Sequence, residues 1–323
     1  MKILVTGGAG FIGSCCTEYL LDHGHQVVVY DSLAHGHRAA VDPRARLLVG
    51  NLADREGIHA VLAAEKPEGI IHFAAFIEVG ESMRDPGKYF RNNTVCGLNL
   101  LDAAVACGVR KIVFSSTAAV YGMPAHVPIP EKEKTEPINP YGESKLAFER
   151  MLRWYREIHG LEYVALRYFN AAGATAKLGE DHRPESHLIP LILQVPLGKR
   201  ESISIYGDDY ATLDGTCIRD YVHVLDLAQA HLLALESRYS GSFNLGSGSG
   251  VSVLEIVETA RRITGHPIPV LFAPRRAGDP PRLISESDAA RRKLGWKPQY
   301  EDAEAIIRSA WSWFQKHPNG YEE

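Results

Sequence analysis

The sequence predicts an α/β protein in which a parallel β-sheet is covered by helices on both faces and is followed by a smaller region of mixed structure. Three observations lead to this fold class. Short, nearly continuous apolar runs alternate with amphipathic stretches in the first half of the chain, a pattern typical of strands buried on both faces. A glycine-rich turn directly follows the first apolar run. Beyond residue 170 the alternation becomes irregular, and Gly and Pro become more frequent.

The apolar runs and the stretches between them define the expected elements. Strands are predicted at residues 3–5, 27–30, 47–49, 70–73 and 112–114, and helices at residues 12–23, 54–64 and 88–107. Further helices are predicted at residues 187–197, 226–236, 252–264 and 302–316. We expect a first domain over residues 1–169 and a second region over residues 170–323, part of which returns to the first domain. No low-complexity linker separates the two, so we expect them to share one interface.

Composition excludes several classes of protein. The 323 residues include 35 Lys and Arg against 39 Asp and Glu, a net charge of −4, and contain no basic block, so neither nucleic acid nor a membrane surface is an expected partner. No apolar run reaches the roughly 18 residues that a membrane helix needs. The five cysteines are scattered without C-x-x-C spacing, which indicates reduced thiols and a cytoplasmic location. No metal site is expected.

The first predicted strand leads into a turn with phosphate-binding spacing. Gly7 permits the tight turn, Gly10 lets the backbone approach a pyrophosphate, and Gly13 lets the next helix pack closely on the sheet. The following strand ends in Asp31, whose carboxylate can bind the 2′-hydroxyl of an adenosine ribose and would repel a 2′-phosphate. These residues predict a Rossmann-type, doubly wound sheet that binds NAD rather than NADP. Arg38 is the nearby residue that could reverse the preference.

A second motif predicts proton-transfer chemistry at the same edge of the sheet. Asn139 and Pro140 suit the N-cap and first position of a helix, which places Tyr141 and Lys145 one turn apart on one helix face. Such a pair is also common on solvated surfaces. However, Thr117 ends a buried strand, and ligands of parallel sheets bind beyond the carboxyl ends of the strands. A hydroxyl, a phenol and a lysine would therefore lie beside the nicotinamide.

The size of the available pKa shift decides whether the phenol of Tyr141 can act as a base. Its pKa of about 10 must fall by roughly 3 units, and one adjacent cation supplies roughly 1 to 3 units. Lys145 alone is therefore marginal. Oxidised nicotinamide carries a second positive charge that disappears on reduction, so proton transfer and hydride transfer become coupled.

Taken together, these motifs resemble the extended short-chain dehydrogenases, and within them the UDP-glucose (UDP-galactose) 4-epimerases. The resemblance runs over nearly the whole chain and rests on residues 6–13, 72–75, 79–82, 115–122, 141–145, 166–170 and 217–226. It implies interconversion of UDP-galactose and UDP-glucose through a transient 4-keto sugar, with NAD regenerated in each cycle. It also implies that Tyr141 is the base, that Lys145 holds the nicotinamide ribose and polarises Tyr141, and that Thr117 binds the reacting hydroxyl.

The resemblance extends the expected binding sites. Beyond the glycines and Asp31, the implied cofactor contacts are Phe11, Ile12, Asn51, Leu52, Phe73, Ala74, Ala75, Lys145 and Tyr168. The implied substrate contacts beyond Thr117 and Tyr141 are Asn170, His187, Leu188, Tyr206, Arg219, Arg276, Asp279 and Leu283. Among them, Asn170 and the two arginines would grip the diphosphate, Tyr206 would lie against uracil, and Asp279 would bind the uridine ribose. A planar guanidinium suits phosphate oxygens.

Departures from the patterns of the family and its relatives occur at three places in the sequence. Asn51 replaces an Asp at the adenine, where its amide oxygen can still accept a hydrogen bond. His187 stands where some members carry Asn, and it is either a phosphate donor or a structural histidine. Residues 118–119 are both Ala, whereas the related 4,6-dehydratases have an Asp-Glu pair there, so elimination of water lacks a proton donor.

Other functions and the assembly remain open at this point. The alternatives are epimerisation of UDP-N-acetylhexosamine, UDP-xylose or UDP-glucuronate, and, in a different class, NAD sensing without catalysis. Leu283 corresponds to a family gate beside the sugar, and we expect it to disfavour a bulky 2-acetamido group only partially. The resemblance further implies a homodimer formed through two helices of each subunit, here residues 88–107 and 142–159.

Overall fold

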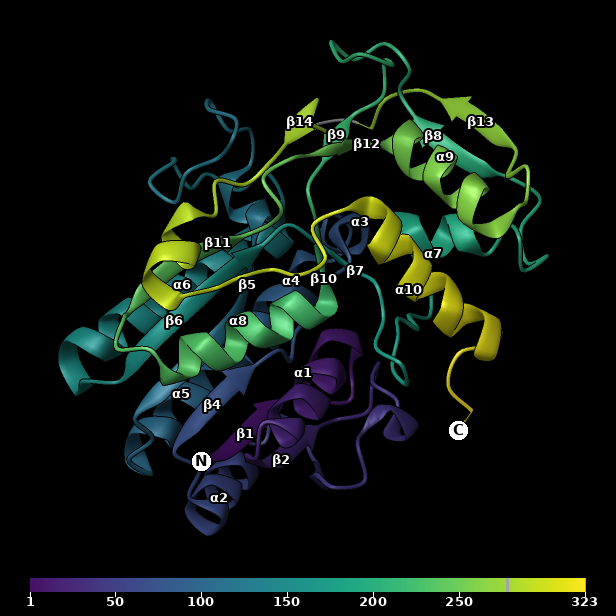
Figure 1. The fold of residues 1–323 in the computed structure, drawn as a ribbon. Coiled ribbons are helices and arrows are strands. Elements are labelled where there is room, and N and C mark those ends of the chain that lie inside the picture. Colours follow the sequence, from purple (N-terminus) through teal and green to yellow (C-terminus); the bar gives the residue numbers. More distant parts are fainter. Residues whose placement is uncertain (277–278, 323) are drawn as a thin grey trace.

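The computed structural model describes residues 1–276 and 279–322 and is built around a seven-stranded parallel sheet (Figure 1). Its strand order is β11-β6-β5-β4-β1-β2-β3, and every neighbouring pair is parallel. The strands are β1 (Lys2–Thr6), β2 (Gln26–Asp31), β3 (Arg46–Val49), β4 (Gly69–His72), β5 (Lys111–Thr117), β6 (Glu162–Tyr168) and β11 (Gly241–Leu245). The order reverses beside β1, which creates the switch point where doubly wound sheets bind ligands.

Helices cover both faces of this sheet, as the apolar strands predict. One face packs against α1 (Phe11–Asp22) and α8 (Val224–Glu236). The other packs against α2 (Arg55–Glu65), α5 (Cys96–Ala106) and α6 (Pro140–His159). Within β1, Ile3 and Val5 face the first group of helices, and Leu4 faces the second. The predicted fold class is therefore confirmed.

Two strands of the sheet, β6 and β11, are absent from the predicted set, and both contain buried polar residues. In β6, the guanidinium of Arg167 donates to both carboxylate oxygens of Glu149, from Nε at 2.9 Å and from Nη2 at 2.5 Å. In β11, the Asn244 side chain accepts from Tyr121 Oη at 2.7 Å and donates to the Ile129 carbonyl at 2.8 Å. Partners distant in sequence therefore allow polar residues in a buried strand.

The helix expected over residues 88–107 is divided. It consists of α4 (Pro86–Tyr89), a π-helical segment η2 (Phe90–Val95) and α5. Asn93 lies in the π-helical segment, where its amide donates to the Phe76 carbonyl and to Ser144 Oγ, both at 3.0 Å. The widened turn thus directs a buried polar side chain toward α6, a frequent use of a π-bulge.

Most of the remaining elements form a second apolar core. Its helices are α7 (Leu188–Leu193), α9 (Val253–Thr264) and α10 (Ala303–Lys316), of which α7 is shorter than predicted, whereas the short helix α3 (Val79–Ser82) packs beside α4 and α6. Three small sheets pair β7 (Asn170–Ala172) with β10 (Tyr221–His223), β8 (Ile203–Tyr206) with β13 (Val270–Ala273), and β9 (Ile218–Arg219) with both β12 (Val251–Ser252) and β14 (Arg282–Leu283). The core contains Ile189, Ile256 and Trp313. Among the described residues, no helix is both long and apolar enough to cross a membrane.

Candidate active site

The glycine turn joins β1 to α1 at the carboxyl edge of the sheet. Gly7 has φ +73°, and a Cβ there would lie 2.5 Å from the backbone nitrogen of Ala74. A Cβ at Gly13 would lie 2.2 Å from the Gly7 carbonyl oxygen, so both positions exclude a side chain. At Gly10, which caps α1, a Cβ would make only an ordinary contact at 3.5 Å. The fold itself therefore leaves room at Gly10, and the predicted approach of a phosphate is what would favour glycine there.

Asp31 lies beside this turn at the end of β2. Its Oδ2 accepts from the backbone N–H of Ala9 at 2.9 Å, and its Oδ1 accepts from that of Leu33 at 2.8 Å. These two donors orient the carboxylate, and each oxygen retains capacity for a ribose hydroxyl. Arg38 is exposed on a short 3₁₀ turn in the segment that follows β2.

Five other residues predicted to contact the cofactor follow β3 and β4. Asn51 is exposed, and its amide oxygen already accepts from Ala53 N–H at 2.8 Å, which leaves one acceptor position for adenine. Leu52 is buried next to it. Phe73 and Ala74 donate their backbone N–H groups to the Thr6 carbonyl at 2.9 and 3.1 Å, which places residues 73–75 against the glycine turn.

The residues predicted to transfer protons converge from β5 and α6. The predicted cap is confirmed, because the Asn139 side chain accepts from Gly142 N–H at 2.8 Å and starts α6. The side chain of Thr117, the last residue of β5, interacts with the Tyr141 phenol and partly opposes the rise of its pKa. Lys145 Nζ donates to the Ser115 carbonyl at 2.8 Å and lies 6.0 Å from the centroid of the Tyr141 ring. The two side chains predicted to act together are therefore close without direct contact.

Burial perturbs both ionisable groups of this pair toward their neutral forms. Desolvation raises the pKa of Tyr141 to about 12 and lowers the pKa of Lys145 to about 7. Desolvation, and secondarily the positive charge of Lys145, lowers the pKa of His72 to about 3. The neighbouring Tyr168 hydroxyl donates to Ser115 Oγ, and desolvation raises its pKa as well. A positively charged ligand would therefore favour ionisation of Tyr141.

Two of the residues predicted to hold the substrate are organised by Asp220, which the sequence analysis did not identify. Its buried carboxylate accepts hydrogen bonds from the backbone N–H and the hydroxyl of Ser247, both at 2.7 Å. It also accepts from the backbone N–H of Ser285 at 2.9 Å and from the Ser285 hydroxyl at 2.6 Å. Its backbone carbonyl accepts from the Asn170 amide at 2.8 Å. Asp220 directly follows Arg219, so this network fixes Arg219 and Asn170 relative to each other.

The remaining predicted substrate contacts pair with one another. Arg219 Nη2 forms an ion pair with Asp279, and the guanidinium carbon of Arg276 lies 4.1 Å from the centroid of the Tyr206 ring. Leu283 pairs with Arg219 across β14 and β9 and packs on an apolar cluster that includes Ala118, the residue after Thr117. Leu283 thus lies between the residues predicted to bind the substrate and those predicted to transfer protons.

His187 and Leu188 mark the start of α7. His187 Nδ1 lies 2.9 Å from a carboxylate oxygen of Glu180 and 3.0 Å from one of Glu185. Burial opposes protonation of this imidazole, yet Glu180 and Glu185 together raise its pKa well above the usual value. Leu188 packs on the second apolar core. These acidic neighbours are a feature that the sequence analysis missed, although the spacing E-x-H-x-x-E-x-H is visible in residues 180–187.

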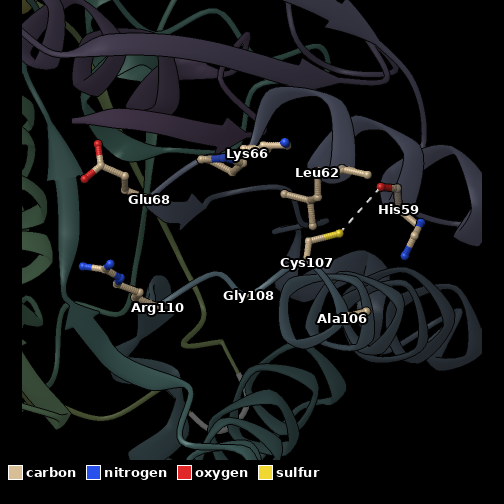
Figure 2. Close-up of a pocket in the computed structure, with 10 residues that line it drawn as sticks. His59, Leu62, Lys66, Glu68, Ala106, Cys107, Gly108 and Arg110 are labelled. Carbon is tan, nitrogen blue, oxygen red and sulfur yellow. Dashed lines mark hydrogen bonds between the residues drawn. The ribbon is translucent and has the colours of Figure 1, made fainter.

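A cavity of about 470 Å³ lies at the opposite edge of the sheet (Figure 2). Its walls include Lys66 and Glu68, which precede β4, and Cys107 and Arg110, which precede β5. Figure 2 shows the contact of the Cys107 thiol with the His59 carbonyl at 3.9 Å. Because ligands of doubly wound sheets bind at the carboxyl ends of the strands, this cavity is not part of the candidate site.

Comparisons with known proteins find similar chains over the whole length of this one. The UDP-glucose 4-epimerase of Lacticaseibacillus casei is 54% identical over 327 residues, covering 99% of this chain and 99% of that protein. A crystal structure of a UDP-glucose 4-epimerase is 50% identical, with a TM-score of 0.98 and full coverage of both chains. The UDP-glucose 4-epimerase from Bifidobacterium longum, crystallised with NAD+ and UDP, is 37% identical, with a TM-score of 0.94 and coverage of 99% and 100%.

The family itself is identified by a match over most of the chain. The model of the NAD dependent epimerase/dehydratase family matches residues 3–246, which include the glycine turn, β5 and the start of α6. The predicted resemblance and the predicted use of NAD are thereby confirmed. The chain belongs to the NAD dependent epimerase/dehydratase family.

Proposed function

We propose that this protein is an NAD-dependent 4-epimerase that interconverts UDP-galactose and UDP-glucose. The observation that carries the proposal is the placement of Tyr141 beside Thr117, with its ring centroid 6.0 Å from Lys145 Nζ, beyond the same edge of the sheet as the glycine turn. Full-length similarity to proteins named UDP-glucose 4-epimerase supports the choice of substrate.

The residues at the cofactor site fit NAD. The free space at Gly10, the oriented Asp31 carboxylate and the backbone of residues 73–75 would hold the pyrophosphate, the adenosine ribose and the nicotinamide half. Bound NAD supplies a reversible acceptor for the hydride of the sugar. Lys145 would hold the nicotinamide ribose with the ammonium that now donates to Ser115.

The protein's own residues move the proton. Thr117 orients the 4-hydroxyl of the sugar, and the phenolate of Tyr141 accepts its proton as C4 is oxidised. Lys145 stabilises the phenolate electrostatically. After the 4-keto sugar has turned over in the pocket, Tyr141 returns the proton to the C4 oxygen as the hydride returns to the other face. One residue therefore serves as base and then as acid.

The substrate would be held through its nucleotide. Arg219 and Arg276 provide planar guanidinium groups for the diphosphate, with Asn170 nearby on β7. Because Arg219 is paired with Asp279, we propose that the nucleotide separates this ion pair, with phosphate taking Arg219 and the uridine ribose taking Asp279. Tyr206 is 38% exposed, which leaves its ring available to uracil. Leu188 and Leu283 would border the sugar diphosphate.

Replacement of the proposed base tests this assignment. Tyr141→Phe keeps the ring and removes the ionisable oxygen, so conversion of UDP-galactose should fall by at least 100-fold while NAD and UDP still bind. Tyr163→Phe is the matched control, because Tyr163 is a buried tyrosine of the apolar core on the face of the sheet that α2, α5 and α6 cover. Turnover of Tyr141→Phe comparable to that of the control would exclude Tyr141 as the base.

We also propose a cytoplasmic homodimer. All five cysteines are free thiols, in keeping with a reducing compartment. The two helical segments expected at the interface pack against each other and expose large apolar side chains: Val95 is 55% exposed, Trp154 56% and Ile158 68%. Light scattering coupled to gel filtration should give twice the chain mass for the native protein and a smaller mass for Trp154→Glu. An unchanged mass for the variant would exclude this interface.

A further inference from the structure

A loop that precedes α7 gathers two histidines and two glutamates. These are Glu180, His182, Glu185 and His187, called the 180–187 cluster below, and one donor atom of each lies within 4.8 Å of all the others. Glu180 Oε1 is 3.1 Å from His182 Nδ1 and 2.9 Å from His187 Nδ1. The carboxylate side chains of Glu180 and Glu185 are only 5% and 7% exposed. Two buried carboxylates in one cluster favour positive charge between them, which either protonated imidazoles or a bound cation can supply.

We propose that the 180–187 cluster binds one zinc ion. Zinc in proteins is bound by four ligands in a tetrahedron, with bonds of about 2.0 to 2.2 Å to nitrogen and oxygen, which puts donor atoms about 3.3 Å apart. The histidine-to-carboxylate distances of the cluster run from 2.9 Å to 3.9 Å and so span that value. Two imidazole nitrogens select zinc over magnesium or calcium, which prefer oxygen ligands. Two carboxylates also neutralise a divalent ion.

The position of the cluster indicates a structural role. Between its first two members, the carbonyl of Asp181 lies 3.0 Å from His37 Nε2. His37 in turn donates its backbone N–H to the carbonyl of Ala9 in the glycine turn at 2.9 Å. At its other end, His187 precedes α7 directly. A bound zinc ion would therefore hold in place the loop that connects the surroundings of the cofactor site to α7. Zinc binding by this loop is a property independent of the proposed epimerase activity.

Zinc binding by the full-length protein tests the proposal. The native protein is treated with a chelator, reloaded with Zn²⁺ alone and passed through gel filtration, and its metal content and affinity are measured. We expect one Zn²⁺ per chain. The zinc affinity of His182→Gln should be at least 10-fold lower, since even mutation of residues that only support the metal ligands lowers metal affinity about 10- to 100-fold. The matched control is His126→Gln, which removes an exposed histidine 2.7 Å from Glu133 and should bind Zn²⁺ as the native protein does.

Two results would overturn the site. One is native protein that retains no Zn²⁺, and the other is equal affinity in native protein and His182→Gln. If the His182→Gln protein does not fold, X-ray absorption at the zinc edge of the loaded native protein decides the question. A shell of four nitrogen and oxygen donors that includes two imidazoles supports the 180–187 cluster, whereas sulfur donors or a shell without imidazole overturn it.

Discussion

Replacing Lys145 with methionine is expected to lower kcat by about 100-fold near neutral pH and to displace the pH profile upward. Burial raises the pKa of Tyr141 to about 12 in the ligand-free protein. A phenolate and an ammonium separated by the 6.0 Å from Lys145 Nζ to the Tyr141 ring centroid attract each other by about 3 kcal/mol at an effective dielectric constant of about 20. That energy equals about 2 pKa units.

In the proposed mechanism, the bound oxidised cofactor supplies the remainder of the decrease in the pKa of Tyr141. Lowering the pKa of Tyr141 from about 12 to near neutrality requires about 5 units, so about 3 units, or 4 kcal/mol, are left after the contribution of Lys145. By reciprocity, the phenolate raises the pKa of Lys145 above the value of about 7 that burial imposes. The lysine is therefore charged when Tyr141 is ionised.

The assay is the kcat for UDP-galactose conversion at saturating NAD, measured from about pH 6 to pH 10, the range in which the ionisation of a tuned base is visible. Lys145→Met should lose about 100-fold at neutral pH and recover as the pH rises by about 2 units. Lys111→Met is the control, since Lys111 is a buried lysine at the amino end of β5 whose Nζ donates to Ser237. A Lys145→Met profile that superimposes on the native one would refute the electrostatic role.

Three further outcomes are expected. Glu149→Gln should reduce the free energy of unfolding by about 3 to 5 kcal/mol in urea titrations, because it leaves the buried Arg167 without its counterion; a loss below 1 kcal/mol would contradict this. Burial lowers the pKa of Lys145 from 10.5 to about 7, so between about pH 7 and pH 10.5 only the unfolded chain carries a proton on this amine. The contribution of Lys145 to the free energy of unfolding therefore rises with pH in that range and should vanish in Lys145→Met. An unaltered pH dependence of the free energy of unfolding in the variant would count against this. Leu283→Ser should raise the rate on UDP-N-acetylgalactosamine relative to UDP-galactose, with a discrimination of about 1 to 3 kcal/mol in the native pocket, and an unchanged ratio would show that Leu283 is not a gate.

The sheet could be predicted where its strands are uniformly apolar. β1, β2 and β5 contain apolar runs that are typical of parallel strands buried on both faces of a sheet. The helices between the strands follow from the alternation of these runs with amphipathic stretches. β11 could not be recognised in this way, because the partner of Asn244 lies far away in sequence, whereas β6 contains an apolar run at residues 163–166 that the prediction did not use. The π-helical segment has a similar cause, since Asn93 finds its partners on α6 and after β4.

The residues proposed to bind the cofactor and to transfer protons could be selected from the sequence because parallel strands bring their carboxyl ends to one edge. Gly7, Asp31 and Thr117 therefore come together without any knowledge of the second region. The substrate contacts were expected only through family resemblance, because short loops carry them and no periodicity marks them. Asp220 was missed for a physical reason: its role depends on Ser247 and Ser285, which come from separate loops.

In the proposed reaction, one hydride leaves C4 of the sugar and returns to the same carbon. The most direct measurement uses UDP-galactose deuterated at C4, incubated with the NAD-loaded protein in ordinary water, with the label in the UDP-glucose product followed by NMR and mass spectrometry. We expect conversion with the deuterium retained at C4, because the hydride removed from C4 is the one returned to it. Loss of the label to water would contradict it, as would the absence of UDP-glucose.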